Sequence, residues 1–93
     1  MDRFLSLKGR FEIDGQRFVL STVGFKGSST EIVAGLLPPF ETMLFAVNEK
    51  GYTDYNDLYC ERYYSEEEAI RRHGELLEKA ESGEKFWKEG DGE

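Results

Sequence analysis

The sequence predicts an α+β domain, in which one C-terminal amphipathic helix packs on one face of an antiparallel sheet of about four strands. Three observations lead to this class: two alternating runs joined by an Asp-Gly pair, two further runs rich in aromatic and β-branched residues, and a helical apolar stripe near the C-terminus. A sheet and a helix with one apolar side each bury those sides most simply against one another. We expect the domain to span residues 1–82, with a charged, flexible tail at 83–93.

The first two strands are expected at residues 3–13 and 16–25. Asp14 and Gly15 between them are a strong hairpin signal, because glycine accepts the positive φ that a two-residue turn needs. Gly9 inside the first run is interpreted as a bulge or a break in that strand.

A long connection follows at residues 26–39, and Pro38-Pro39 at its end exclude a helix or a central strand there. The third strand is expected at 40–47, where the nearly continuous apolar second half is typical of a central strand covered on both faces. A turn and a polar loop then lead to the fourth strand at 58–64, whose strand propensity comes from aromatic residues.

Ser65 predicts the start of the helix as its N-cap, and Glu68 completes a capping box three residues later. The helix is expected to end near Ser82, after which the tail either frays or docks Phe86-Trp87 back on the sheet. The residues of the helical apolar stripe are Ala69, Ile70, His73, Leu76, Leu77 and Ala80.

Composition excludes several functions. The 93 residues suffice for one modest core, and 19 acidic against 12 basic residues give a net charge of −7. The basic excess is confined to residues 1–27, so no basic stripe favours direct binding of DNA or RNA. The acidic C-terminal half suits a basic partner surface or simply solubility. We expect no membrane span and no secretory leader, and the single cysteine points to a reducing cytosol.

No catalytic set emerges from the sequence, and neither an enzyme activity nor a metal or cofactor is expected. His73 is the only histidine and lacks a partner at motif spacing, so a partly buried structural ring is preferred over a base. Cys60 is interpreted as a small buried hydrophobe, with a thiolate beside Arg62 as the alternative. Glu41 and Glu61 lie inside expected strands, where they face solvent or pair with a cross-strand base.

Two segments carry weaker signals of binding. Residues 24–30 combine glycines, Lys26 and the hydroxyls of Ser28 and Ser29, as an anion cradle does, although a plain flexible loop is the simpler interpretation. The five tyrosines lie between residues 52 and 64, interleaved with acids, a pattern typical of a recognition surface or of sheet cover.

Several short motifs resemble a group of small uncharacterised bacteriophage proteins. The matching blocks are S-T-V at 21–23, P-P-F-E-T-M-L-F at 38–45, E-R-Y at 61–63 and E-E-A followed by a histidine at 67–73. Where that group often has an Asp-His pair in the loop, this chain has Lys26-Gly27-Ser28-Ser29. The resemblance implies a phage origin and the host bacterial cytoplasm, and it supplies no mechanism.

We therefore expect a phage accessory protein that acts by binding rather than by catalysis, in counter-defence. In one version an acidic, tyrosine-bearing surface binds and inhibits a host protein; in the other, homo-oligomers form pockets that hold an anionic nucleotide immune signal. The alternative is a structural or assembly accessory of the virion. The candidate ligand- or partner-binding residues are Arg17, Thr22, Lys26, Ser28, Ser29, Glu41, Arg62, Tyr63 and His73.

Overall fold

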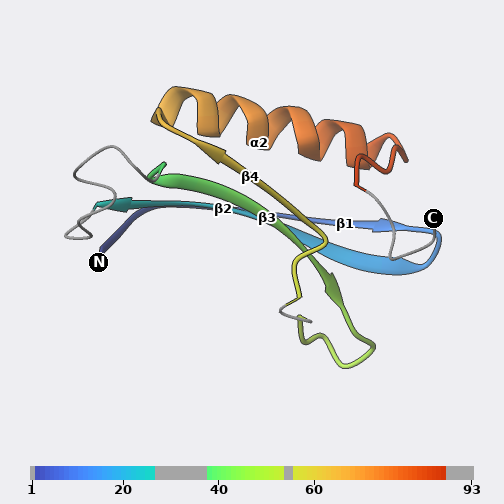
Figure 1. Cartoon of the computed structure of the whole chain (residues 1–93). Helices are drawn as coiled ribbons and strands as arrows, with labels where there is room; N and C mark the ends of the chain where they lie inside the picture. The colour runs from blue at the N-terminus through green and yellow to red at the C-terminus, as the bar shows by residue number, and fades with distance from the viewer. Residues whose placement is uncertain (1, 27–37, 54–55, 88–93) are drawn as a thin grey trace.

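A computed structural model describes residues 2–26, 38–53 and 56–87, without the side chains of residues 2–4 and 26. One four-stranded antiparallel sheet, ordered β1-β2-β3-β4, carries a single helix across one face (Figure 1). This arrangement confirms the α+β class that the sequence predicts. The elements are β1 (Asp2–Ile13), β2 (Gln16–Lys26), β3 (Phe40–Val47), β4 (Tyr59–Tyr63) and α2 (Glu66–Glu81).

The β1–β2 hairpin turns at the predicted Asp-Gly pair. Asp14 has a φ of 54° and Gly15 a φ of 81°, and Ile13 and Gln16 face each other across the turn. Positive φ at both central residues is the geometry that matches the right-handed twist of the two strands. The hairpin is therefore determined locally, by two adjacent residues.

Gly9 has a different role from the one expected. The irregularity in β1 lies between Arg3 and Leu5, whereas Gly9 pairs regularly with Leu20. A Cβ atom at Gly9 would lie 2.7 Å from the side-chain methyls of Leu77 in α2. The expected bulge at Gly9 is thus wrong, and the glycine instead lets the helix approach the sheet closely.

The two remaining strands lie where the sequence places them. β3 has the expected bounds, and β4 is one residue shorter at each end than the expected 58–64. The amide of Phe25 donates a 2.9 Å hydrogen bond to the carbonyl of Pro39, which ties the end of β2 to the start of β3. Most of the expected long connection, residues 27–37, lies outside the described residues.

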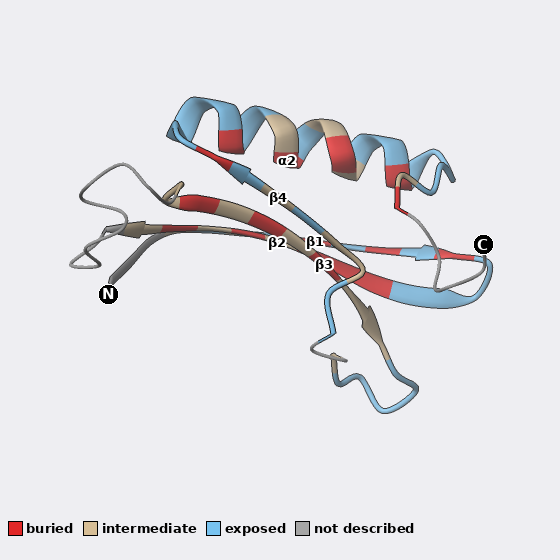
Figure 2. Ribbon diagram, viewed as in Figure 1, coloured by how far each residue is buried: buried red, intermediate tan, exposed pale blue. Residues whose placement is uncertain are grey.

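Helix α2 begins at the predicted cap, since Ser65 Oγ accepts a 3.1 Å hydrogen bond from the amide of Glu68. Its buried side faces the sheet and its other side is exposed (Figure 2). Ile70 is an exception to the predicted stripe, because 48% of its surface remains exposed. The buried residues of the helix are Ala69, His73, Leu76 and Ala80.

The chain returns to the core after the helix. The ring of Trp87 is 6% exposed and lies 5.1 Å from the ring of Phe18 and 6.1 Å from that of Phe11. Docking of Phe86-Trp87, one of the two alternatives for this segment, is therefore what the structure shows. The core continues to Trp87, five residues beyond the expected boundary at 82, and residues 88–93 lie outside the described part.

Candidate ligand-binding site

The predicted site residues fall on two different faces of the sheet. Thr22, Tyr63 and His73 are buried on the face that α2 covers. Arg17 and Glu41 line a hollow on the opposite face, and Arg62 pairs with Glu41 at its border. The side chain of Lys26, together with Ser28 and Ser29, lies outside the described residues. One pocket therefore cannot contain the whole predicted set.

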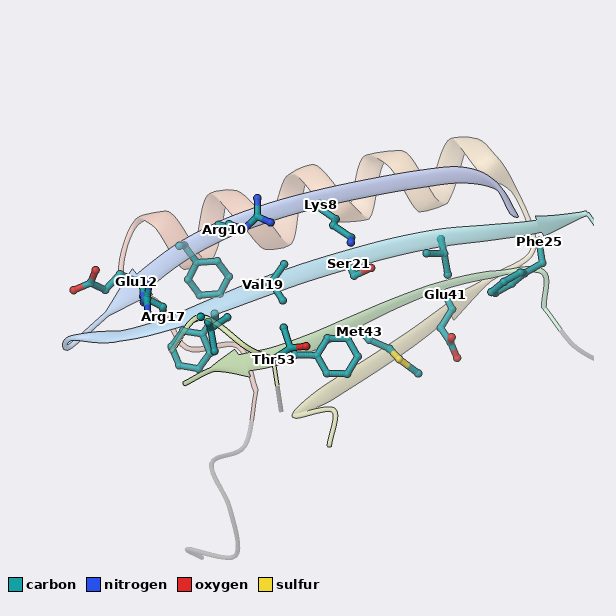
Figure 3. A pocket seen from close by; sticks show the side chains of 16 residues that line it. Lys8, Arg10, Glu12, Arg17, Val19, Ser21, Phe25, Glu41, Met43 and Thr53 are labelled. Carbon is teal, nitrogen blue, oxygen red and sulfur yellow. The ribbon is translucent and has the colours of Figure 1, made fainter. Parts of the chain in front are cut away.

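The hollow on the open face is a trough of about 760 Å³ along β1, β2 and β3 (Figure 3). Binding sites for small molecules commonly have volumes of about 300–1,000 Å³. Among the described residues no helix or strand covers this face, so the cover predicted for both faces of β3 is found on one face only. The apolar floor consists of Val19, Val23, Phe25, Met43, Phe45 and Val47.

Two exposed cations, Lys8 and Arg10, line the β1 side of the trough (Figure 3). No ion pair within residues 2–26, 38–53 and 56–87 involves either of them. With only Glu12 as an acid beside them on β1, they leave this border basic in a chain whose net charge is −7. Neither residue is among those expected from the sequence to bind a ligand, although the charges at 8, 10 and 12 alternate with Gly9 and Phe11, as on a strand with one solvent-facing side.

Arg17 also lines the trough, but its guanidinium is committed to the backbone. Nη2 of Arg17 donates to the carbonyls of Asn48 at 3.1 Å and Glu49 at 3.4 Å. Nε2 of Gln16 donates to the carbonyl of Val47 at 2.9 Å beside them. Arg17 therefore holds the turn that closes one end of the trough, which makes it a positioning residue.

Glu41 lies at the opposite end of the trough from that turn and faces Arg62 across the β3–β4 ladder. Its Oε2 accepts from Arg62 Nη2 at 2.9 Å and Nε at 3.0 Å, and from the Cys60 thiol at 3.7 Å. The predicted cross-strand pairing of this acid is thus present. No hydrogen bond from the described residues reaches Glu41 Oε1, so that oxygen can still accept one.

Cys60 is exposed, so the interpretation as a small buried hydrophobe is wrong. Alternation explains the difference, because position 60 shares the open face with Glu41 and Arg62 rather than the face under α2. Partial desolvation raises the pKa of its thiol, and the nearby Glu41 carboxylate raises it further. Cys60 is consequently a protonated donor at neutral pH.

The face under α2 contains a connected set of polar side chains. Thr22 Oγ1 lies 2.8 Å from His73 Nδ1 and also contacts Thr42 Oγ1. Thr42 Oγ1 in turn lies 3.0 Å from the hydroxyl of Tyr63. Both threonines are completely buried, so each hydroxyl depends on these partners. Burial lowers the pKa of His73, which favours its neutral form.

The set ends at a surface ion pair. The Tyr63 hydroxyl donates to Glu61 Oε1 at 2.7 Å, and Arg72 of α2 holds the same carboxylate at 3.1 and 3.2 Å. Burial alone raises the pKa of Glu61, but the hydrogen bonds from Arg72 and Tyr63 outweigh it, so the pKa lies below its ordinary value. Glu61 therefore pairs with the helix rather than with a neighbouring strand.

The tyrosines do not form one surface. Tyr52 and Tyr64 are 68% and 63% exposed, whereas Tyr63 is buried and Tyr59 stacks edge-on against Phe86 at 5.1 Å. Tyr55 lies outside the described residues. The structure thus assigns part of the cluster to sheet cover and leaves two rings in solvent.

No protein-family model, curated protein or solved structure matches this chain. Within the described ranges, no helix is long and apolar enough to cross a membrane. The same residues include no group of three or more His, Cys, Asp or Glu side chains placed to hold a metal ion.

Proposed function

We propose that this chain is a phage accessory protein that sequesters a small anionic nucleotide in the trough on the open face of its sheet. The phage setting and the host bacterial cytoplasm rest on the sequence resemblance, and counter-defence against a nucleotide immune signal is the role that fits them. The binding site itself rests on the geometry of the trough.

The observation that carries the proposal is the combination of an apolar floor with a basic border. Phe25 offers aromatic surface on which a base can stack. Lys8 and Arg10 are exposed and have no ion pair among the described residues, so they can bind a phosphate. The acidic remainder of the chain repels long polyanions, which favours a small nucleotide over DNA or RNA.

Binding rather than catalysis is supported by where the reactive side chains lie. Cys60 is on the open face, whereas His73 is buried under α2 on the other face. The two cannot act as nucleophile and base for one substrate, because the sheet separates them. The raised pKa of the Cys60 thiol also disfavours the thiolate.

All of the residues that line the trough come from one chain. The expected homo-oligomer stays a prediction. Native mass spectrometry of gently purified protein tests both for a trapped ligand and for the number of copies. A mass excess of a few hundred daltons per chain would support a trapped ligand, and the same spectrum gives the number of copies.

The direct test is calorimetric titration with a panel of mono-, di- and cyclic nucleotides. Lys8→Ala/Arg10→Ala should weaken binding at least tenfold, because it removes the two cations of the β1 border. The matched control is Arg71→Ala/Lys79→Ala, which removes the same two residue types from exposed positions on α2. Unchanged binding in that control would show that the effect is local to the trough.

Absence of binding across the whole panel would overturn the nucleotide proposal. A pull-down from host lysate would then test the host protein, and mass spectrometry of purified particles would test the virion role. Equal loss of binding in the Lys8/Arg10 variant and its control would place the site away from the trough.

A further inference from the structure

We propose that the trough selects a guanine base over adenine, through the open carboxylate oxygen of Glu41. This inference rests on the proposed function, because it names the chemical class of the nucleotide in that same site. It assigns Glu41 as the residue that determines specificity, with Arg62 and Cys60 as its positioning residues.

The orientation of the Glu41 carboxylate is fixed by its neighbours. Arg62 and Cys60 direct three donor atoms at Oε2, and the side chain of Glu41 is only 19% exposed. A carboxylate held through one oxygen presents the other in a defined direction. Oε1, which receives no hydrogen bond from the described residues, is therefore a pre-oriented acceptor on a residue that lines the trough.

An aromatic ring lies at the same end. Val23 pairs with Glu41 across the β2–β3 ladder, and Phe25 is two residues farther along on the same side of β2. Figure 3 shows Phe25 and Glu41 together, away from Arg10. A base stacked on Phe25 would thus present its edge to Glu41.

The cations lie at a suitable distance for the phosphate. Lys8 faces Ser21, which faces Met43, two residues from Glu41 in β3. Strand spacing and rise place the Cα atoms of Lys8 and Glu41 about 12 Å apart. A nucleoside monophosphate can span a distance of this order, with its phosphate at the β1 border.

The choice between purines follows from hydrogen-bond chemistry. An ionised carboxylate only accepts hydrogen bonds. Guanine presents two adjacent donors, N1–H and the exocyclic amino group, to such an acceptor. Adenine places its N1 lone pair beside its amino group, and that lone pair would repel Glu41. In Glu41→Gln, the donors of Arg62 would hold the amide oxygen, so the amide nitrogen would face the ligand as a donor, which matches the N1 lone pair of adenine instead.

The experiment compares GMP and AMP by calorimetry on the folded wild-type protein, Glu41→Gln and Glu12→Gln. Glu12 is the matched control, because it also lines the trough but lies on β1, away from the Phe25 end. We expect wild type to bind GMP about tenfold or more tightly than AMP, the order expected for a well-aligned pair of hydrogen bonds. Glu41→Gln should lower that ratio at least tenfold, and Glu12→Gln should leave it unchanged.

Equal binding of GMP and AMP by wild type, or an unchanged ratio in Glu41→Gln, would overturn guanine selection while leaving nucleotide binding in place. Failure of both nucleotides to bind wild type would remove the proposed function along with this inference. Amide NMR spectra of each variant establish that the fold is retained, so a lost preference reports on the site.

Discussion

The hydroxyl of Thr22 and the imidazole of His73 lie 2.8 Å apart beneath α2. Which of the two donates the hydrogen bond follows from counting the hydroxyl hydrogens in the buried set. Tyr63 has one hydroxyl hydrogen, and the Glu61 carboxylate can only accept it. Thr42 must therefore donate to the oxygen of Tyr63, and Thr22 to the oxygen of Thr42. Thr22 then has no hydrogen left for His73.

The first prediction is that neutral His73 carries its proton on Nδ1 and donates it to Thr22. Because the chain has a single histidine, long-range ¹H–¹⁵N spectra report this tautomer without ambiguity. Tyr63→Phe should remove the constraint and allow the Nε2–H tautomer to appear. An Nε2–H tautomer in the wild-type protein would contradict the proposed proton order.

The second prediction concerns stability. Tyr63→Phe leaves Thr42 without one partner in a buried setting, which should lower the free energy of unfolding by about 1–3 kcal/mol. Tyr64→Phe makes the same change one residue away on a ring that is 63% exposed, and it should have almost no effect. Urea denaturation of the two variants measures the difference, and equal effects would be inconsistent with the buried polar set.

The third prediction is a pH dependence of stability. Burial lowers the pKa of His73 in the folded state below the ordinary 6.5, so the unfolded chain takes up a proton first. The free energy of unfolding should consequently fall as the pH drops below about 6.5, and level off below the folded pKa. His73→Gln should flatten the profile in this range when stability is measured from pH 8 to 5.

A separate loss is expected at lower pH. The pKa of Glu61 lies below its ordinary value of 4.5, so its contribution to stability is present above that value and disappears as the pH falls through the folded pKa. This second step should remain in His73→Gln and be reduced in Glu61→Gln. A single step shared by both variants would be inconsistent with two separate groups.

The fourth prediction tests the extended core. Trp87→Ala removes a ring packed against Phe11 and Phe18 and should lower the free energy of unfolding by about 3–5 kcal/mol. Phe86 is less buried, so Phe86→Ala should have a smaller effect. Circular dichroism during denaturation measures both, and a Trp87→Ala effect below that of Phe86→Ala would contradict the packing described above.

Local signals made most of the fold predictable. The Asp14-Gly15 turn and the Ser65 cap act through neighbouring residues, and both are where the sequence places them. The roles of Gly9 and Cys60 depend instead on contacts with Leu77 and Glu41, which are distant in the chain. A single sequence shows that a residue is small or acidic, but not which residue lies opposite.

The site was predictable only in part, for the same reason. Arg17, Glu41 and Arg62 were recognisable as polar residues in strands, yet their grouping depends on strand register. Lys8 and Arg10 lie in an ordinary alternating run, which looks like the solvent-facing side of any strand. Only the pairing of β1 with β2, and of β2 with β3, shows that they border an apolar floor.

In the two central strands, alternate residues form the core and the trough. Substitutions at neighbouring codons should therefore have different effects. In β2 and β3 the even-numbered side chains, such as Leu20, Thr22 and Leu44, point into the core, while odd-numbered ones, such as Val19 and Glu41, line the trough. Saturation mutagenesis should therefore yield two interleaved phenotypes, abundance at even codons and ligand retention at odd ones. A one-residue slip in the register of either strand would exchange its two sets.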